Sequence, residues 1–196
     1  MKHAAVGFRA HSGWTALVAI SFEEGLPLVL LRQRPHLVKT FTYEFRQPYH
    51  SAVKRPPAEA HSIISRVRTD AGDLAYQAIR SVQTSLQEHD YELKRCGLLL
   101  ASARPLPALP QILASHALIH TADGELFREA LIHASLRCGF EMFTAKESEL
   151  LASASHALHL QPDELVRRLT GLGSALGSPW TKDEKLAALV AWLSLL

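Results

Sequence analysis

The amino-acid sequence predicts an α/β fold in which one mixed β-sheet carries helices on both faces. The first third alternates short apolar runs with glycine-containing turns, a pattern that is typical of antiparallel strands. A long segment then repeats apolar residues every three or four positions, which indicates an amphipathic helix. Two short strand-like runs follow, each succeeded by helical periodicity, as expected of strands added in parallel to a sheet between helical layers.

The composition is that of a single globular domain spanning residues 1–196. An apolar fraction of 47% with 20% charged residues is ordinary for such a domain. Residues 1–98 contain 13 Lys and Arg against 9 Asp and Glu, and the remainder contains 8 against 10, a split too mild to predict a nucleic-acid partner. No apolar stretch approaches the ~20 residues of a membrane span. Cys96 and Cys138 lie in apolar surroundings, so we expect reduced thiols and a cytoplasmic protein without a membrane partner.

Three strands are expected at the N-terminus. Ala4–Phe8, Trp14–Phe22 and Leu26–Arg34 are rich in apolar residues, and the second and third are separated by Glu23-Glu24-Gly25. The polar turn His11-Ser12-Gly13 joins the first two strands, with a glycine that can adopt positive φ. These features predict an antiparallel meander.

Residues 35–57 form a long irregular loop in which aromatic residues and prolines alternate with basic side chains. Loops of this length in compact domains are often functional. The aromatic and basic side chains suit stacking on a base or covering a pocket. The simpler interpretation, which we favour, is that the aromatic residues anchor the loop on the core.

The clearest helix begins near Pro57 and continues to Leu86, with an apolar stripe on one side and charges on the other. Gly72 weakens its middle and allows a bend or break there. The short apolar run Cys96–Ala101 then predicts a buried strand. It ends in the proline-rich segment 102–110, which suits neither a strand ladder nor a helix interior.

A short helix is expected over Gln111–His120 and a second one from an Asp123 N-cap to Gly139. Phe140–Phe143 follows as a short strand. Thr144-Ala-Lys-Glu147 matches a capping box and predicts a helix that begins there.

The segment 160–196 is expected to be helical. Pro162 opens one helix, and glycines between residues 171 and 177 lead to Trp180. Thr181-Lys-Asp-Glu184 is a second capping box, at the start of the terminal helix.

This order of elements resembles the ribonuclease-H-like superfamily, which includes the Holliday-junction resolvases and the actin-like ATPases. The resemblance covers most of the chain. Locally, Val6–Trp14 is similar to the first-strand signature of the resolvase branch, in which a Gly-Ile-Asp-Pro-Gly run precedes a Gly-aromatic pair. The whole chain also resembles an uncharacterised bacterial protein family, a likeness that implies no function.

The superfamily's metal-binding acids are mostly absent here. Arg9 stands where the resemblance implies a metal-binding aspartate, and the end of the fourth strand reads Ala101-Ser102-Ala103 instead of carrying an acid. Only the last helix supplies acids near the third position, Asp183 and Glu184. Two-metal nuclease chemistry needs a cluster of carboxylates to hold the cations. The sequence therefore predicts no standard nuclease activity.

One candidate ligand site lies at the carboxyl edge of the predicted sheet. Loops at the carboxyl ends of strands form the usual ligand crevice in α/β folds. The polar residues expected there are His11, Ser12, Ser102, Arg104 and Asp183. They suggest a small or nucleotide-like ligand.

A second candidate site is the stretch from His116 to Arg128. His116 and His120 are four residues apart and share one helix face, with Cβ atoms roughly 6 Å apart. That spacing can bind a divalent metal, with Asp123 or Glu125 as third ligand. The glutamate of a His-Glu-x-x-His metalloprotease motif is missing between them.

The same stretch allows two other interpretations. Either histidine is a general acid–base, because imidazole titrates near neutrality, with Glu125 orienting the ring and Ser12 or Ser102 as nucleophile. Alternatively, Asp123 and Glu125 only stabilise a helix N-terminus, and Arg128 pairs with them from the next turn.

The leading functional hypothesis is a divergent ribonuclease-H-like domain that binds a small or nucleotide-like ligand without two-metal nuclease activity. A metal-assisted hydrolase using His116 and His120, with a divalent metal as cofactor, is the first alternative. A non-catalytic scaffold, or an interaction protein that forms a homodimer through an apolar helix face, is the second.

Overall fold

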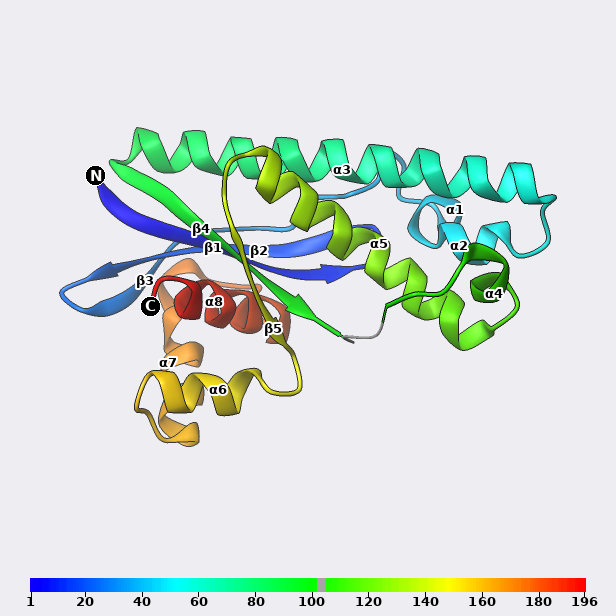
Figure 1. Cartoon of the computed structure of the whole chain (residues 1–196). Coiled ribbons are helices and arrows are strands. Elements are labelled where there is room, and N and C mark those ends of the chain that lie inside the picture. Colours follow the sequence, from blue (N-terminus) through cyan, green and yellow to red (C-terminus); the bar gives the residue numbers. More distant parts are fainter. Residues whose placement is uncertain (102–104) are drawn as a thin grey trace.

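A computed structural model, which describes residues 1–101 and 105–196, contains a five-stranded mixed sheet between two helical layers (Figure 1). The strand order is β3-β2-β1-β4-β5. The first three strands pair antiparallel, and the last two continue the sheet parallel to β1. The strands are β1 (Lys2–His11), β2 (Trp14–Glu23), β3 (Leu26–Gln33), β4 (Tyr91–Leu100) and β5 (Met142–Lys146). The predicted α/β class and mixed sheet are confirmed.

Strand β1 is the centre of the sheet and separates two apolar cores. Val6 and Phe8 point into the core on one face, and Ala5 points into the core on the other. This alternation follows from the period-two geometry of a strand. A strand covered on both faces must be apolar throughout its middle, as this one is.

The long helix α3 (Pro57–Glu88) and α5 (His116–Arg137) cover one face of the sheet (Figure 1). The buried side chains of α3 recur at the predicted spacings of three and four, and the helix continues through Gly72 without a break. Three short helices lie beside its N-terminal half and are α1 (Tyr43–Arg46), α2 (Pro48–Ala52) and α4 (Leu109–Leu113).

Helix α8 (Lys182–Ser194) packs on the other face and contacts β1, β2 and β4. Almost all of its residues are buried, since α6 (Leu150–Ala157) and α7 (Pro162–Leu172) cover its outer side. A short 3₁₀ turn, η1 (Ser174–Leu176), links α7 to the segment before α8. The predicted Thr181–Glu184 capping box is confirmed.

Glycines in the sheet permit the close approach of α8. A Cβ atom added at Gly7 would lie 1.9 Å from the carbonyl oxygen of Ala187, and one at Gly97 would lie 2.8 Å from that of Val190. Both contacts are far shorter than van der Waals separation and involve backbone, which cannot rotate away. The helix can therefore sit this low only where the strands beneath it lack side chains.

Two predicted helix starts are wrong. Helix α5 is continuous from His116, with Ser115 as its N-cap, so Asp123 lies inside the helix. The Thr144–Glu147 box does not begin a helix, because β5 continues to Lys146 and α6 starts at Leu150. Pairing of β5 with β4 supplies backbone hydrogen bonds that replace the local cap.

The predicted irregular loop 35–57 contains α1 and α2, and part of it packs on the core. Leu37, Val38 and Tyr49 are buried, whereas Phe41 and Tyr43 remain exposed. Within the described ranges, no helix combines the length and apolar character that crossing a bilayer requires.

The two glycines Gly7 and Gly72 give a matched test of this packing. We expect Gly7→Ala to destabilise the fold by about 1–3 kcal/mol or more, because the new Cβ atom strikes the backbone of α8. Gly72→Ala, which has open space around it, should stabilise the fold by up to ~1 kcal/mol through helix propensity. Urea unfolding of both variants measures the two changes. Equal stabilities would contradict the close approach of α8.

Candidate functional site

At the carboxyl end of β1, Arg9 is the centre of a charged cluster. Its Nε and Nη2 atoms donate to the two carboxylate oxygens of Glu147 at 3.1 and 3.0 Å, and its Nη1 donates to Asp183. Lys182 Nζ lies 2.9 Å from the same Glu147 carboxylate. His11 Nε2 lies 3.1 Å from Asp183 Oδ1. Strand β1, the residue after β5 and the start of α8 thus meet through Arg9.

The charges in this cluster compensate one another. Burial acts to raise the pKa of Glu147, but hydrogen bonds and charge from Arg9 and Lys182 outweigh it and hold that pKa below its usual value. Burial lowers the pKa of His11, which favours its neutral form. A fixed guanidinium therefore occupies the carboxylate oxygens that would otherwise be free for a cation.

The ligand set predicted at this edge is only partly assembled in the described part of the chain. His11 and Asp183 lie together, as stated above. Ser12 lies in the β1–β2 turn, where its backbone oxygen accepts a hydrogen bond from Arg46 Nε at 3.3 Å. Ser102 and Arg104 fall outside the described residues.

Aromatic and basic side chains stack beside this edge. The His11 ring lies on Trp14 with centroids 4.3 Å apart, and the Arg34 guanidinium lies 5.0 Å from the Trp14 ring. His36 stacks on Phe41 at 4.5 Å. A cavity of about 210 Å³ opens between Trp14, Arg34, His36 and Phe41.

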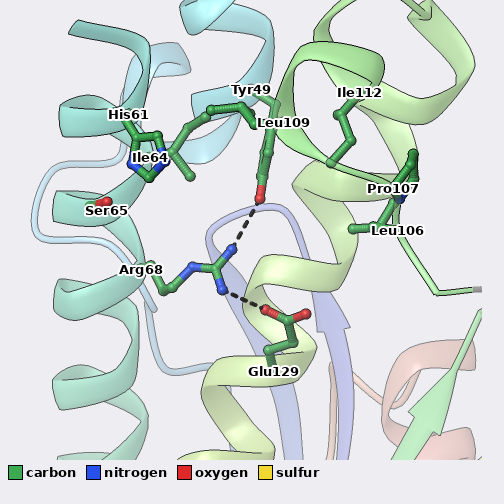
Figure 2. Close-up of a pocket in the computed structure, with 10 residues that line it drawn as sticks. All are labelled: Tyr49, His61, Ile64, Ser65, Arg68, Leu106, Pro107, Leu109, Ile112 and Glu129. Carbon is green, nitrogen blue, oxygen red and sulfur yellow. Dashed lines mark hydrogen bonds and ion pairs between the residues drawn. The ribbon is translucent and has the colours of Figure 1, made fainter. Parts of the chain in front are cut away.

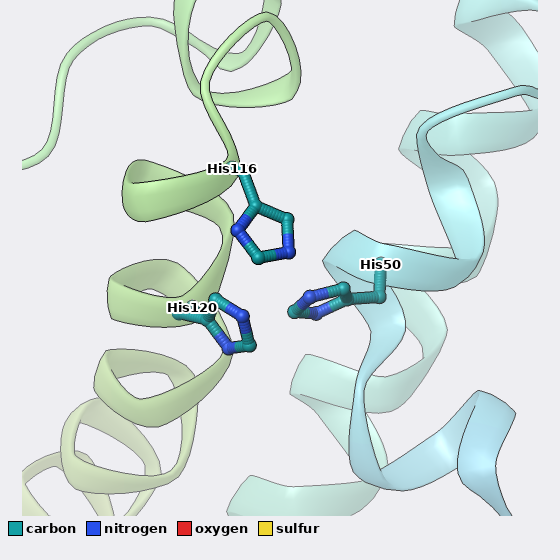
Figure 3. Close-up of side chains that lie close together, drawn as sticks. All are labelled: His50, His116 and His120. Atoms are coloured by element: carbon teal, nitrogen blue, oxygen red, sulfur yellow. The ribbon is translucent and has the colours of Figure 1, made fainter.

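A second cluster brings three histidines together from two helices (Figure 3). His116 and His120 occupy successive turns at the start of α5, and His50 faces them from α2. One ring nitrogen from each histidine lies within 4.8 Å of the corresponding atoms of the other two. The rings of His50 and His120 have centroids 4.4 Å apart, and those of His116 and His120 are 4.5 Å apart.

The His50 ring is held by a buried carboxylate. Asp123, whose exposed fraction is 2%, lies with Oδ2 2.5 Å from His50 Nδ1. Its Oδ1 accepts a hydrogen bond from the Tyr49 backbone N–H at 2.8 Å. A carboxylate acceptor at Nδ1 fixes the tautomer that leaves Nε2 unprotonated. Burial raises the pKa of Asp123, against the opposing effect of these hydrogen bonds, so a cation bound nearby would favour its ionised form.

The histidines of α5 were visible in the sequence, but His50 was not. It lies 66 residues before His116, in the irregular loop, where no periodicity places it. Its distinguishing signal is the short Pro48-Tyr49-His50 segment, which begins α2. Asp123, predicted as a third metal ligand, contacts His50 on the side opposite to the unprotonated nitrogen.

Glu125 contacts Arg128 rather than a histidine. Arg128 Nη1 donates to Glu125 Oε1 at 2.9 Å, and both side chains are mostly buried. This is the pairing one turn apart that the structural interpretation of the stretch predicts.

One cavity adjoins the histidine cluster, and another lies beyond Tyr49. One of about 430 Å³, mainly apolar, is lined by His50 and His116 together with residues of α2 and α4. The other, of about 420 Å³, lies behind Tyr49 between α3 and α5 (Figure 2). There Arg68 donates to the Tyr49 hydroxyl and to Glu129, both at 3.1 Å.

Comparison with known proteins identifies the fold. No family model and no curated protein sequence matches the chain. Thermus thermophilus RuvC in complex with a Holliday-junction substrate is similar in structure, with 10% identity, a TM-score of 0.51 and coverage of 96% of this chain and 90% of that one. A second T. thermophilus RuvC structure has 10% sequence identity and a TM-score of 0.50, with the same coverage of both chains. An Aquifex aeolicus member of the Ppx/GppA family has 11% sequence identity and a TM-score of 0.39, and the match covers 79% of this chain and 39% of that one. The chain has a ribonuclease-H-like fold, as its element order predicts.

Removing Arg9 tests the charge compensation at the β1 edge. We expect Arg9→Met to destabilise the fold by about 1–3 kcal/mol, because Glu147 and Asp183 lose their shared partner in partly buried positions. Millimolar Mg²⁺ should raise the melting temperature of this variant more than that of the wild type. Arg167→Met, which removes an exposed ion pair, is the control and should leave both quantities unchanged. Equal Mg²⁺ effects on all three proteins would contradict the assignment.

Proposed function

We propose that this chain is a divergent ribonuclease-H-like domain that binds a divalent transition metal through His50, His116 and His120 and uses it in hydrolysis. The observation that carries the proposal is the convergence of three imidazoles from two helices, one of them held by a buried carboxylate. The Arg9 cluster supports the absence of two-metal nuclease chemistry, since its carboxylates already bind a guanidinium.

The donor set fits a metal of the zinc type. Neutral imidazoles suit zinc, copper, nickel and iron, whereas magnesium and calcium prefer oxygen ligands. A tetrahedral zinc with Zn–N bonds of about 2.0–2.1 Å holds its nitrogens roughly 3.3 Å apart. The nitrogens of this cluster need to close by a modest amount, and the exposed rings of His116 and His120 have room to rotate.

Asp123 completes the features expected of such a centre. Metal-binding histidines usually donate their second N–H to a carboxylate, which fixes the ring and raises its basicity. Asp123 is placed to do this for His50, and the Tyr49 N–H holds the carboxylate in turn. If His116 and His120 were only a pair of surface histidines, no buried carboxylate would be needed to orient the ring of His50 toward them.

Three protein ligands leave a fourth metal position for water, as in catalytic zinc sites. A metal held by these three histidines would lower the pKa of that water toward neutrality and so would supply a nucleophile for hydrolysis. With such a metal the site would suit cleavage of an ester or phosphoester by water, in which the oxygen would go to the carbonyl or phosphoryl centre and the proton to the leaving group. The apolar cavity lined by His50 and His116 offers space for the substrate beside the metal.

A specific observation favours a second function, the binding of a nucleotide-like ligand at the β1 edge. The cavity between Trp14, Arg34, His36 and Phe41 combines aromatic faces with a guanidinium. Bases stack on such faces, and guanidinium groups pair with phosphates. Fluorescence of Trp14 during titration with AMP would test this function separately from metal binding.

Metal binding is tested with Zn²⁺ by isothermal titration calorimetry. We expect one site per chain in the wild type and a loss of at least 100-fold in affinity in His116→Ala. Asp123→Asn should weaken binding by about 10–100-fold, because it loosens His50 without removing a ligand. His133→Ala, an exposed histidine of the same helix, is the matched control and should bind as the wild type does. Unchanged affinity in His116→Ala would rule out the site.

Hydrolysis and its pH dependence form a separate test. The Zn²⁺-loaded protein should cleave p-nitrophenyl acetate or bis-p-nitrophenyl phosphate faster than metal-free protein does, and His116→Ala should lose the difference. Metal affinity should fall in acid, because protons compete with the metal for the imidazole nitrogens. Zn²⁺ binding without any metal-dependent cleavage would retain the metal site and reject the hydrolase.

A further inference from the structure

We infer that Arg128 forms an oxyanion-binding subsite next to the histidine cluster, so that the substrate of the proposed hydrolase carries a carboxylate or phosphate group. The role as a substrate subsite rests on the proposed function, whereas the binding of the anion does not. The subsite is a cavity of about 270 Å³ lined by Ala101, His120, Thr121, Gly124, Glu125 and Arg128.

The cavity lies where a substrate could reach both groups. Ala101 follows β4, so the cavity opens at the carboxyl end of a central strand, where ligands of α/β sheets usually bind. His120 is shared between this cavity and the three-histidine cluster. Its volume falls just below the range of roughly 300–1,000 Å³ typical of drug-sized ligands, which favours a small group.

Arg128 has unused donors at this cavity. Its Nη1 donates to Glu125, but Nε and Nη2 make no hydrogen bond to any described residue. Nε is also closed to solvent, which makes it one of two buried side-chain polar atoms without a partner in the described ranges. A buried donor without an acceptor carries a free-energy cost, and it is greater on a charged group.

The unused edge of the guanidinium is the one that recognises oxyanions. Nε and Nη2 point in parallel and match the two oxygens of a carboxylate or phosphate, in the bidentate geometry typical of arginine. A small rotation of the side chain would turn Nε from its closed position toward the cavity. Gly124 has no side chain beside this guanidinium, and a Cβ atom added there would lie 3.0 Å from Arg128 Nη1, which is tighter than ordinary van der Waals contact.

Glu125 accepts one hydrogen bond from Arg128 and leaves the Nε and Nη2 donors of the guanidinium free of hydrogen bonds to described residues. The single bond from Nη1 fixes the guanidinium over the helix, and both side chains are more than four-fifths buried. The negative charge of Glu125 also opposes a second anion. Removing that charge should therefore strengthen anion binding while leaving the bidentate edge intact.

The test uses metal-free protein, so that an anion cannot bind to a metal instead. Inorganic phosphate and acetate are titrated separately, in a buffer without either, while the arginine Nε–H resonances are followed by NMR. We expect one buried Nε–H signal, absent in Arg128→Met, to shift on titration. The two probes distinguish a phosphate from a carboxylate preference.

The variants separate recognition from general charge. Arg128→Met should lose about 10–100-fold in affinity for the preferred anion, as expected for charge-assisted hydrogen bonds. Glu125→Gln should bind that anion more tightly than the wild type. Arg137→Met is the matched control, because Arg137 lies on the same helix and pairs with the exposed Asp73, and it should bind unchanged.

Either of two results would overturn the subsite: no shift of the Arg128 signal with both anions, or equal affinities in Arg128→Met and the wild type. If Arg128→Met fails to fold, the wild-type signal and the Glu125→Gln affinity still decide. Anion binding in a protein that does not bind Zn²⁺ would retain the subsite and reject the metal centre. Zn²⁺ binding without anion binding would do the reverse.

Discussion

The buried carboxylate of Asp123 is the interaction on which the candidate site depends. It accepts hydrogen bonds from the backbone of Tyr49 and the ring of His50, so it fixes an irregular segment against helix α5. An unpaired carboxylate at this depth would be costly, and the two donors remove that cost. The same bonds aim His50 at the two histidines of the helix. One interaction thus stabilises the loop and assembles the three rings.

The fold and the chemistry of this chain are separable. The sheet, its order and its helical layers are those of a ribonuclease-H-like domain, yet the carboxyl end of β1 carries Arg9 bound to Glu147 and Asp183. The Arg9 guanidinium compensates the negative charges of these two acids, as a bound metal ion would. The histidines, the buried aspartate and Arg128 lie instead along the first turns of α5 and the facing α2. A fold does not by itself imply a function. In this chain the candidate metal site lies on α2 and α5 rather than at the carboxyl end of β1.

Sequence patterns predicted the structure best where it depends on interactions between residues close together in the chain. The apolar periodicity of α3, the Thr181 capping box and the antiparallel meander were all predictable, because each depends on residues close together in the sequence. The Thr144 box failed because pairing of β5 with β4 satisfied the same backbone groups. Asp123 has the residue type of an N-cap, but burial against His50 gives it a different partner.

The sequence by itself determined the class of fold, the presence of Arg9 where the resemblance implies a metal-binding aspartate, and the placing of His116 and His120 on one helix face. Those conclusions need only periodicity, residue type and helical spacing. The tertiary structure alone decided that His50 joins the pair and that Asp123 supports it. It also decided that Arg128 keeps an unused edge beside them. The contacts of His50 join residues tens of positions apart, and they form only when the core packs α2 against α5.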